Sequence, residues 1–147
     1  YFICNGEIYN YKKIYKLLNI KPETNSDCES IIHLYKEYGI EYTLQNLDGV
    51  FAFTLYDSNI NKVYIARDPY GVRPLYFGKT NEDLMVFSSL LKQVSGLCRN
   101  CYNFKAGTYT ELTIYKNQFI IFADIKLRHS KLHQHFLRLM MSCKSEG

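Results

Sequence analysis

The spacing of hydrophobic and polar positions separates two early helices from a series of later strands. Residues 2–5 form a short apolar run that is typical of a buried strand. Apolar residues then recur three or four positions apart, which predicts helices over 10–18 and 27–38. The expected boundary residues are Asn10 and Ser26 as N-caps and Gly39 as the end of the second helix.

Extended runs and tight turns make up the next part of the chain. The runs predict strands over 50–57, 62–67, 74–78 and 84–88. "DPYG" at residues 68–71 has the Pro and Gly positions of a type I turn. "LLKQV" indicates a short helix, and "GTYTELTIYKN" with "QFIIFA" indicates a last hairpin. Short antiparallel strands after two helices predict the α+β class.

Composition narrows the class of protein without naming a function. The 147 residues are 47% hydrophobic and 22% charged, which is an ordinary globular composition. No apolar run has the length of a membrane span and no signal peptide is visible, so we expect a cytoplasmic protein without a membrane partner. The net charge of +4 comes largely from the sparse basic tail after Asp124, which argues against nucleic acid as a partner.

Five cysteines are spaced irregularly, which predicts reduced thiols. They are Cys4, Cys28, Cys98, Cys101 and Cys143. Cys98 and Cys101 form a lone CxxC motif, with His129 and His133 downstream. The gap between Cys101 and His129 is too long for a zinc finger, so we predict no metal site. Coincidence or a mild redox pair is the favoured interpretation of the motif.

Four motifs carry the specific information, and they occur in a fixed order. They are "NGEIYN", "SDCE", "LDGVFAFTLYD" and "RDPYGVRPLYFG". Together they resemble the glutaminase domain of glutamine-hydrolysing asparagine synthetases, within the class II glutamine amidotransferases. The resemblance implies an Ntn-hydrolase-like sandwich of two antiparallel sheets between helical layers, with its N-terminal portion missing. It assigns residues 1–122 to a partial amidotransferase domain, and 123–147 to a tail similar to the helix that opens the synthetase domain.

The resemblance also implies a chemistry, the hydrolysis of the side-chain amide of glutamine. It assigns the Asn5 side chain and the Gly6 backbone N–H to an oxyanion hole. It assigns Glu7 and Asp27 to the α-ammonium group of the substrate. From its position alone, Asp27 is better explained as a carboxylate in the first turn of a helix.

Other parts of the family pattern imply structural roles and further partners. The "RDPYGVRP" signature is interpreted as structural, with an Arg–Asp contact that fixes a turn; its residues are Arg67, Asp68, Gly71 and Pro74. No cofactor is expected in this domain. ATP, magnesium and aspartate belong to the synthetase domain that the resemblance implies, and a homodimer is left open.

Three departures from the family pattern qualify the assignment. The cysteine nucleophile and the arginine that binds the substrate carboxylate would precede Tyr1, so we expect a chain that is incomplete at both ends and inactive alone. Cys4 is no substitute because it has no free α-amino group. Leu90 stands where the family has Glu. Two alternatives stay open, another class II amidotransferase of the purine or glucosamine pathways and a non-catalytic relic or binding domain.

Overall fold

Two antiparallel sheets and three helices make up the described part of the chain, residues 1–115 and 118–120 of a computed structural model. The strands are β1 (Phe2–Ile8), β2 (Gly49–Asp57), β3 (Lys62–Arg67), β4 (Tyr76–Thr80), β5 (Met85–Ser88), β6 (Cys98–Asn103), β7 (Tyr109–Tyr115) and β8 (Gln118–Ile120). The helices are α1 (Tyr11–Leu18), α2 (Glu29–Asn46) and α3 (Leu91–Leu97). Among these helices, none has the length and apolar character needed to cross a membrane.

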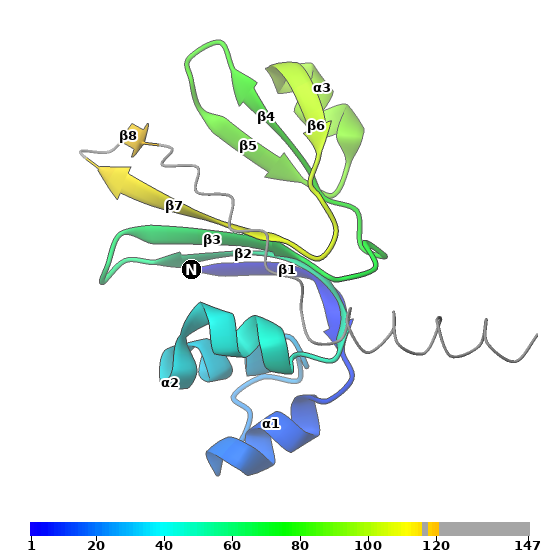
Figure 1. Cartoon of the computed structure of the whole chain (residues 1–147), viewed down its shortest axis with the longest axis vertical. Coiled ribbons are helices and arrows are strands. Elements are labelled where there is room, and N and C mark those ends of the chain that lie inside the picture. Colours follow the sequence, from blue (N-terminus) through cyan, green and yellow to red (C-terminus); the bar gives the residue numbers. More distant parts are fainter. Residues whose placement is uncertain (116–117, 121–147) are drawn as a thin grey trace, which may run out of the picture.

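The sheets lie in layers, which confirms the predicted α+β sandwich. The larger sheet has the strand order β1-β2-β3-β7-β8 and the smaller one β5-β4-β6, with every pairing antiparallel. In Figure 1, α1 and α2 cover one face of the larger sheet and the smaller sheet lies on its other side. Helix α3 packs against the strands of the smaller sheet. Strand β1 is therefore an edge strand of the larger sheet.

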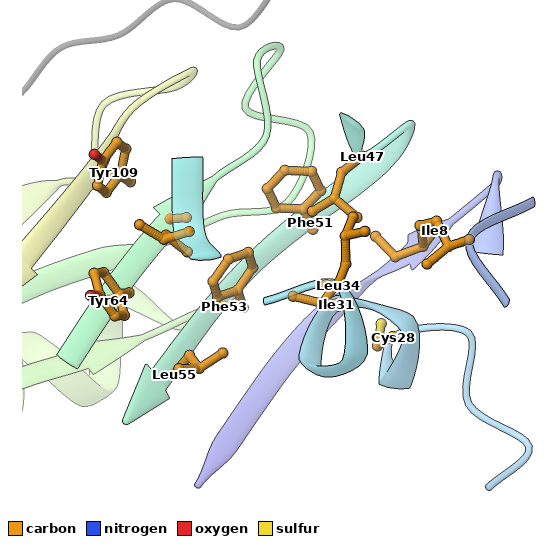
Figure 2. Close-up of a cluster of buried hydrophobic side chains, with 13 residues drawn as sticks. Ile8, Cys28, Ile31, Leu34, Leu47, Phe51, Phe53, Leu55, Tyr64 and Tyr109 are labelled. Carbon is orange, nitrogen blue, oxygen red and sulfur yellow. The ribbon is translucent and has the colours of Figure 1, made fainter. Parts of the chain in front are cut away.

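The main core lies between α2 and the larger sheet. Along β2 the aromatic and aliphatic side chains of Phe51, Phe53 and Leu55 alternate toward the helices, as the period of a strand requires. From α2, Ile31 and Leu34 meet them and are fully buried. Figure 2 shows these side chains packed between the helix and the strand.

A second core fills the space between the two sheets. The opposite face of the larger sheet contributes Ala52, Val63, Ile65 and Leu112, and Leu75 and Phe104 lie between the sheets. From the smaller sheet, the rings of Phe77 and Phe87 stack with their centroids 6.2 Å apart and pack on this cluster. The larger sheet is thus buried on both faces, which explains why β2 and β3 are nearly continuous apolar runs.

The helices follow the predicted pattern with two corrections. The first helix begins one residue after Asn10, but the Asn10 side chain does not cap it and instead contacts Asn46 O and Asp48 N. Gly39 interrupts the second helix, with φ 78° and ψ 176°, but the chain resumes helical structure and continues to Asn46. The resumed segment buries Ile40 in the main core, and that burial explains its formation after a helix-breaking glycine.

Most of the strand predictions are confirmed, and those for β1, β4 and β6 are corrected. The predictions over 50–57, 62–67 and 84–88 and the short helix are confirmed. The last hairpin is confirmed up to residue 120, and residues 121–123 of its predicted second strand lie outside the described residues. Strand β1 runs on to Ile8 instead of ending at residue 5, because its pairing with β2 continues through the Asn-Gly-Glu segment. Strand β4 begins after Pro74, which has no N–H for a ladder. Strand β6 was not predicted, because its sequence "CRNCYN" is mostly polar and exposed.

The tail lies outside the described residues. The boundary at residue 122 and the assignment of 123–147 to the start of a further helix therefore stay predictions.

Packing in the main core can be tested at Leu34, which is fully buried between α2 and the sheet. Leu34→Ala is expected to lower the free energy of unfolding by about 2–5 kcal/mol, because it removes apolar contacts and leaves a cavity. Urea unfolding followed by circular dichroism measures this change. Leu17→Ala in α1 is the matched control, since Leu17 is 57% exposed and its truncation should change stability by less than about 0.5 kcal/mol. Equal losses in the two variants would contradict the packing described.

Candidate functional site: the outer edge of β1

The pairing of β1 with β2 decides which backbone N–H and C=O groups of β1 remain available to bind other groups. Tyr1 and Tyr56 exchange both backbone hydrogen bonds at 2.8 Å. At the other end, Tyr9 N–H donates to Asp48 O, also at 2.8 Å. Hydrogen-bonded and non-hydrogen-bonded pairs alternate along an antiparallel ladder, so the odd-numbered residues of β1 direct their N–H and C=O groups toward β2. The even-numbered residues direct theirs to the open side of the strand, which we call the outer edge of β1.

Two contacts confirm this direction. Ile8 N–H donates to a carboxylate oxygen of Asp27, and the Cys28 thiol donates to Gly6 O at 3.6 Å. The partners come from the segment just before α2, on the open side of the strand. Gly6 lies opposite Phe51 in a non-hydrogen-bonded pair, so its N–H also faces the outer edge. The strand thus presents a backbone donor beside the Asp27 carboxylate.

Gly6 is required by the close approach of β2. A Cβ atom added to Gly6 would lie 2.5 Å from Val50 O and 2.9 Å from the Cα of Phe51. These are backbone atoms of a buried strand and cannot move aside cheaply. Crowding of a substrate is therefore not needed to explain the glycine.

The side chains of Asn5 and Glu7 lie on the other face of β1 from Cys28 and the helices. Both are exposed, as the alternation along the strand requires. Asn5 lines a pocket of ≈ 290 Å³ between the sheets, together with Pro74 and Ser88. The Glu7 carboxylate lies 3.6 Å from the guanidinium of Arg73, which sequence analysis did not assign to the site.

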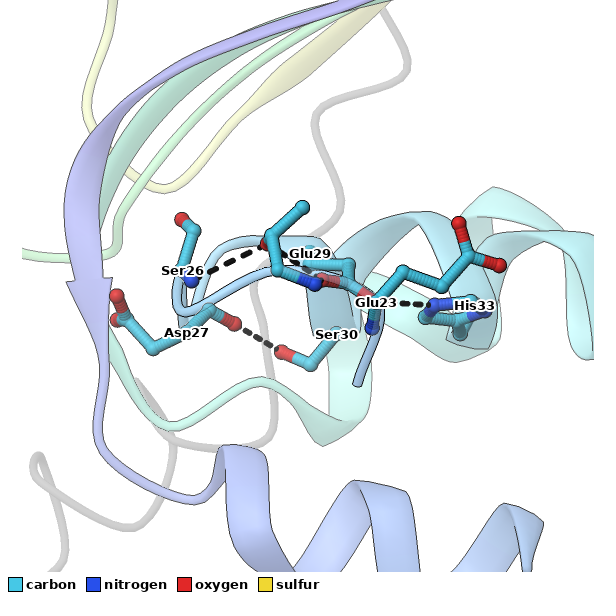
Figure 3. A network of polar contacts seen from close by, with 7 residues as sticks. Glu23, Ser26, Asp27, Glu29, Ser30 and His33 are labelled. Atoms are coloured by element: carbon cyan, nitrogen blue, oxygen red, sulfur yellow. Dashed lines mark hydrogen bonds and ion pairs between the residues drawn. The ribbon is translucent and has the colours of Figure 1, made fainter. Parts of the chain in front are cut away.

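Asp27 is positioned by a hydrogen-bonded loop before α2. The Glu29 carboxylate accepts hydrogen bonds from the backbone N–H groups of Glu23 and Thr24 at 2.8 and 2.7 Å, and lies 2.9 Å from His33 Nε2. Ser30 Oγ donates to Asp27 O at 2.6 Å. Figure 3 shows this network, with the Asp27 carboxylate directed toward the strand. The backbone of Ser26 accepts from Glu29 N, while Cys28 occupies the N-cap predicted for Ser26.

The same contacts set the acidity of Glu29. Hydrogen bonds from Glu23 N–H first, and then from the Thr24 hydroxyl and His33, lower the pKa of Glu29 to about 2. The carboxylate form therefore holds the loop together at neutral pH. Glu29 belongs to the "SDCE" motif, but the sequence predicted no role for it.

The "RDPYGVRP" segment is structural, but its contacts differ from the predicted one. The Arg67 side chain donates to Arg73 O at 2.7 Å and Gly71 O at 2.8 Å. The fully buried Asp68 carboxylate accepts from the N–H groups of Tyr70 and Arg73 at 3.0 and 3.2 Å. The two side chains thus fix the turn separately, each by binding a different set of backbone atoms in residues 70–73. These contacts replace the predicted Arg–Asp contact. The loop places Arg73 beside Glu7.

The structure brings the four predicted site residues to one strand edge but not to one face. Gly6 N–H faces the outer edge, where the Asp27 carboxylate binds Ile8 N–H, whereas the side chains of Asn5 and Glu7 lie on the face of β1 away from the helices. Leu90, at the position of the family Glu, is 57% exposed. In residues 1–115 and 118–120, no group of three or more His, Cys, Asp or Glu side chains is arranged to hold a metal ion. The roles that the resemblance implies for these four residues in binding one substrate stay predictions.

Comparison with known proteins defines the class. A family model described as a glutamine amidotransferase domain matches residues 1–135, so the chain belongs to this family. Among named relatives, the chain is 40% identical over 115 residues to a probable glutamine-hydrolysing asparagine synthetase of Acanthamoeba polyphaga mimivirus, covering 78% of this chain and 21% of that protein. It is 47% identical over 92 residues to the human glutamine-hydrolysing asparagine synthetase, covering 62% and 16%. The chain thus spans about a fifth of the length of these relatives.

Solved structures agree with the class. The glutamine phosphoribosylpyrophosphate amidotransferase of B. subtilis superposes with a TM-score of 0.66 at 25% identity, over 81% of this chain and 28% of that one. A structure described as the allosteric regulatory enzyme of purine biosynthesis superposes with a TM-score of 0.65, also at 25% identity, over 80% and 27%. The fold expected from the four motifs is therefore confirmed.

A pair of glycine substitutions tests the close approach at β1. Gly6→Ala is expected to lower the free energy of unfolding by about 1–3 kcal/mol, because the added methyl group meets the backbone of β2. Gly96→Ala in α3 is the matched control. A Cβ there meets nothing within 4 Å, so this change should stabilise the chain by about 0.4–1 kcal/mol. Urea unfolding of both variants measures the difference, and a Gly6→Ala variant as stable as the wild type would refute the account.

The acidity of Glu29 predicts how stability depends on pH. Because the pKa in the folded state is below the ordinary value of 4.5, the contribution of Glu29 is full above about pH 4.5 and is lost as pH falls through about 2. The free energy of unfolding should therefore separate wild type from Glu29→Gln at pH 6, and the two should converge near pH 2. Glu82→Gln, in the exposed turn between β4 and β5, is the control. A separation that stays constant from pH 6 to pH 2 would contradict the role of Glu29.

Proposed function

We propose that this chain is the glutamine-binding part of a glutamine-hydrolysing asparagine synthetase, where it helps to release ammonia from glutamine. The observation that supports this most is the outward N–H of Gly6 beside the Asp27 carboxylate. One group is suited to a carbonyl oxygen and the other to an ammonium group. A glutamine molecule carries both, separated by a short aliphatic chain.

Gly6 and Asn5 supply the electrostatic part of the reaction in this proposal. Attack on the side-chain amide of glutamine places negative charge on the carbonyl oxygen. A donor that is already oriented toward that oxygen lowers the barrier by about 3–4 kcal/mol. The Gly6 N–H is fixed in direction by the β1–β2 ladder, so it needs no reorganisation. The Asn5 amide is the second donor.

Asp27 and Glu7 supply the charge that holds the substrate. A carboxylate has about four lone-pair sites, so the hydrogen bond from Ile8 N–H leaves Asp27 able to accept from an ammonium group. Glu7 is held close to Arg73, whose positive charge offsets the repulsion between two carboxylates. These charges support the proposal that Asp27 and Glu7 bind the α-ammonium end of an amino acid.

The acceptor of the ammonia is proposed from the relatives. Named asparagine synthetases are 40–47% identical to this chain, whereas the superposed phosphoribosylpyrophosphate amidotransferase is 25% identical. This difference favours aspartate as the acceptor of ammonia over the acceptor used by an amidotransferase of the purine pathway. Its activation by ATP and magnesium takes place in a synthetase domain outside this chain, in the cytoplasm. The homodimer stays a prediction.

The experiment uses Asp27→Asn in a protein that joins this chain to a synthetase domain. Asparagine keeps an acceptor for Ile8 N–H but removes the charge. We expect kcat/KM for glutamine to fall about 10- to 100-fold, the loss of one hydrogen bond to a charged group. Synthesis from free ammonia should stay unchanged. Asp83→Asn on the exposed β4–β5 turn is the control, and equal loss of both activities in Asp27→Asn would identify Asp27 as a purely structural cap.

A further inference from the structure

The contacts of one threonine hold the loop that leads to Asp27 and α2. Thr24 Oγ1 donates to a carboxylate oxygen of Glu29 at 2.5 Å, and Thr24 N–H donates to the same oxygen at 2.7 Å. The hydroxyl oxygen also accepts from Ser26 N–H at 3.2 Å. Figure 3 shows Glu23, Ser26 and Glu29 gathered in this network. The Thr24 hydroxyl therefore joins the loop to the first residue of α2.

The loop that carries Thr24 is open to solvent. Every residue from 21 to 26 is exposed, and the chain has no helix or strand between Leu18 and Glu29. An exposed loop without regular structure can be drawn into the extended form in which modifying enzymes bind a chain. The Thr24 hydroxyl is thus within reach of such an enzyme.

Acidic residues surround Thr24 along the chain. Glu23 precedes it, Asp27 stands three positions after it and Glu29 five positions after it. Protein kinases choose their substrates partly by such charge patterns. A hydroxyl with carboxylates on its C-terminal side suits a kinase whose substrate groove is basic.

A phosphate on Thr24 would replace attraction to Glu29 by repulsion. The hydroxyl proton that binds the Glu29 carboxylate would be lost, and the phosphate carries a charge of about −1.5 to −2 at neutral pH. Glu29 is ionised there, because hydrogen bonds, first from Glu23 N–H, lower its pKa to about 2. Among the described residues, its one ion-pair partner is His33. Two anions at this distance would drive the loop away from α2.

We propose that Thr24 is a phosphorylation site whose modification releases the loop that holds Asp27 beside β1. The Thr24 oxygen attacks the γ-phosphorus of ATP, so that a new O–P bond forms and the bond to ADP breaks. The hydroxyl proton passes to a base of the kinase. In the released loop, the Asp27 carboxylate no longer accepts from Ile8 N–H. This change does not depend on which ligand the carboxylate binds.

Thr80 offers a matched control within the same chain. It begins the turn between β4 and β5, and Asp83 stands three positions after it, as Asp27 does after Thr24. Its hydroxyl oxygen accepts from Glu82 N–H at 3.3 Å and from Leu84 N–H at 3.1 Å. A phosphate keeps an acceptor oxygen for these donors. This turn also lies at the other end of the molecule from α1 and α2 (Figure 1).

The test begins with phosphorylation of the 147-residue chain by a casein kinase that prefers acidic sequences, with ATP and magnesium. Mass spectrometry locates the phosphate, and ion exchange separates the form modified on Thr24 from the form modified on Thr80. Amide hydrogen exchange is then followed by NMR. The unmodified chain and the Thr80 form are the controls.

We expect three amides to lose protection in the Thr24 form. They are Glu23 N–H and Thr24 N–H, which bind Glu29, and Ile8 N–H, which binds Asp27. Their protection factors should fall at least about tenfold, the effect of one hydrogen bond to a charged group. The loss should be larger at pH 7.5 than at pH 5, because the second pKa of the phosphate is about 6. The Thr80 form should match the unmodified chain at these amides.

Three results would overturn the proposal. One is a chain that the kinase modifies on Ser26 or Thr80 but not on Thr24. Another is a phosphate on Thr24 that leaves the protection of Glu23, Thr24 and Ile8 N–H unchanged. The third is an equal loss of protection at pH 5 and pH 7.5, because the size of the phosphate and not its charge would then release the loop.

Discussion

The hydrogen-bond ladder between β1 and β2 fixes the direction of every group in the candidate site. It turns Gly6 N–H and Ile8 N–H to the outer edge and places the side chains of Asn5 and Glu7 on the face away from α2. A shift of one residue would exchange these directions along the whole strand. The register is held by Ile8, whose buried side chain must face the main core, and by the close backbone approach at Gly6.

The second half of the site depends on a loop that has little apolar surface of its own. The Glu29 carboxylate binds two backbone N–H groups of the loop and lies close to His33. These polar contacts, in place of hydrophobic packing, fix the path of the chain up to Asp27. The Cys28 thiol then joins this loop to the strand by donating to Gly6 O.

Sequence patterns predicted the elements with long apolar runs or helical spacing, and missed those that contacts distant in sequence stabilise. The apolar strands over 50–57 and 62–67 could be found because both faces of the larger sheet are buried. The mostly polar β6 and the helical segment after Gly39 could not, since pairing with β4 and burial of Ile40 stabilise them. The motifs predicted site roles for Gly6 and Asp27, which stay predictions, but only the register shows which backbone groups of β1 face away from β2.

Amide hydrogen exchange along β1 tests the central claim most directly. In the 147-residue chain, the N–H groups of Ile3, Asn5 and Glu7 should exchange slowly because they bind β2, whereas Gly6 N–H should exchange fast. Ile8 N–H should be slow in the wild type and fast in Asp27→Ala, which removes its acceptor. Protection of Gly6 N–H equal to that of Asn5 would contradict the account, because the proposed oxyanion donor would then be part of the ladder.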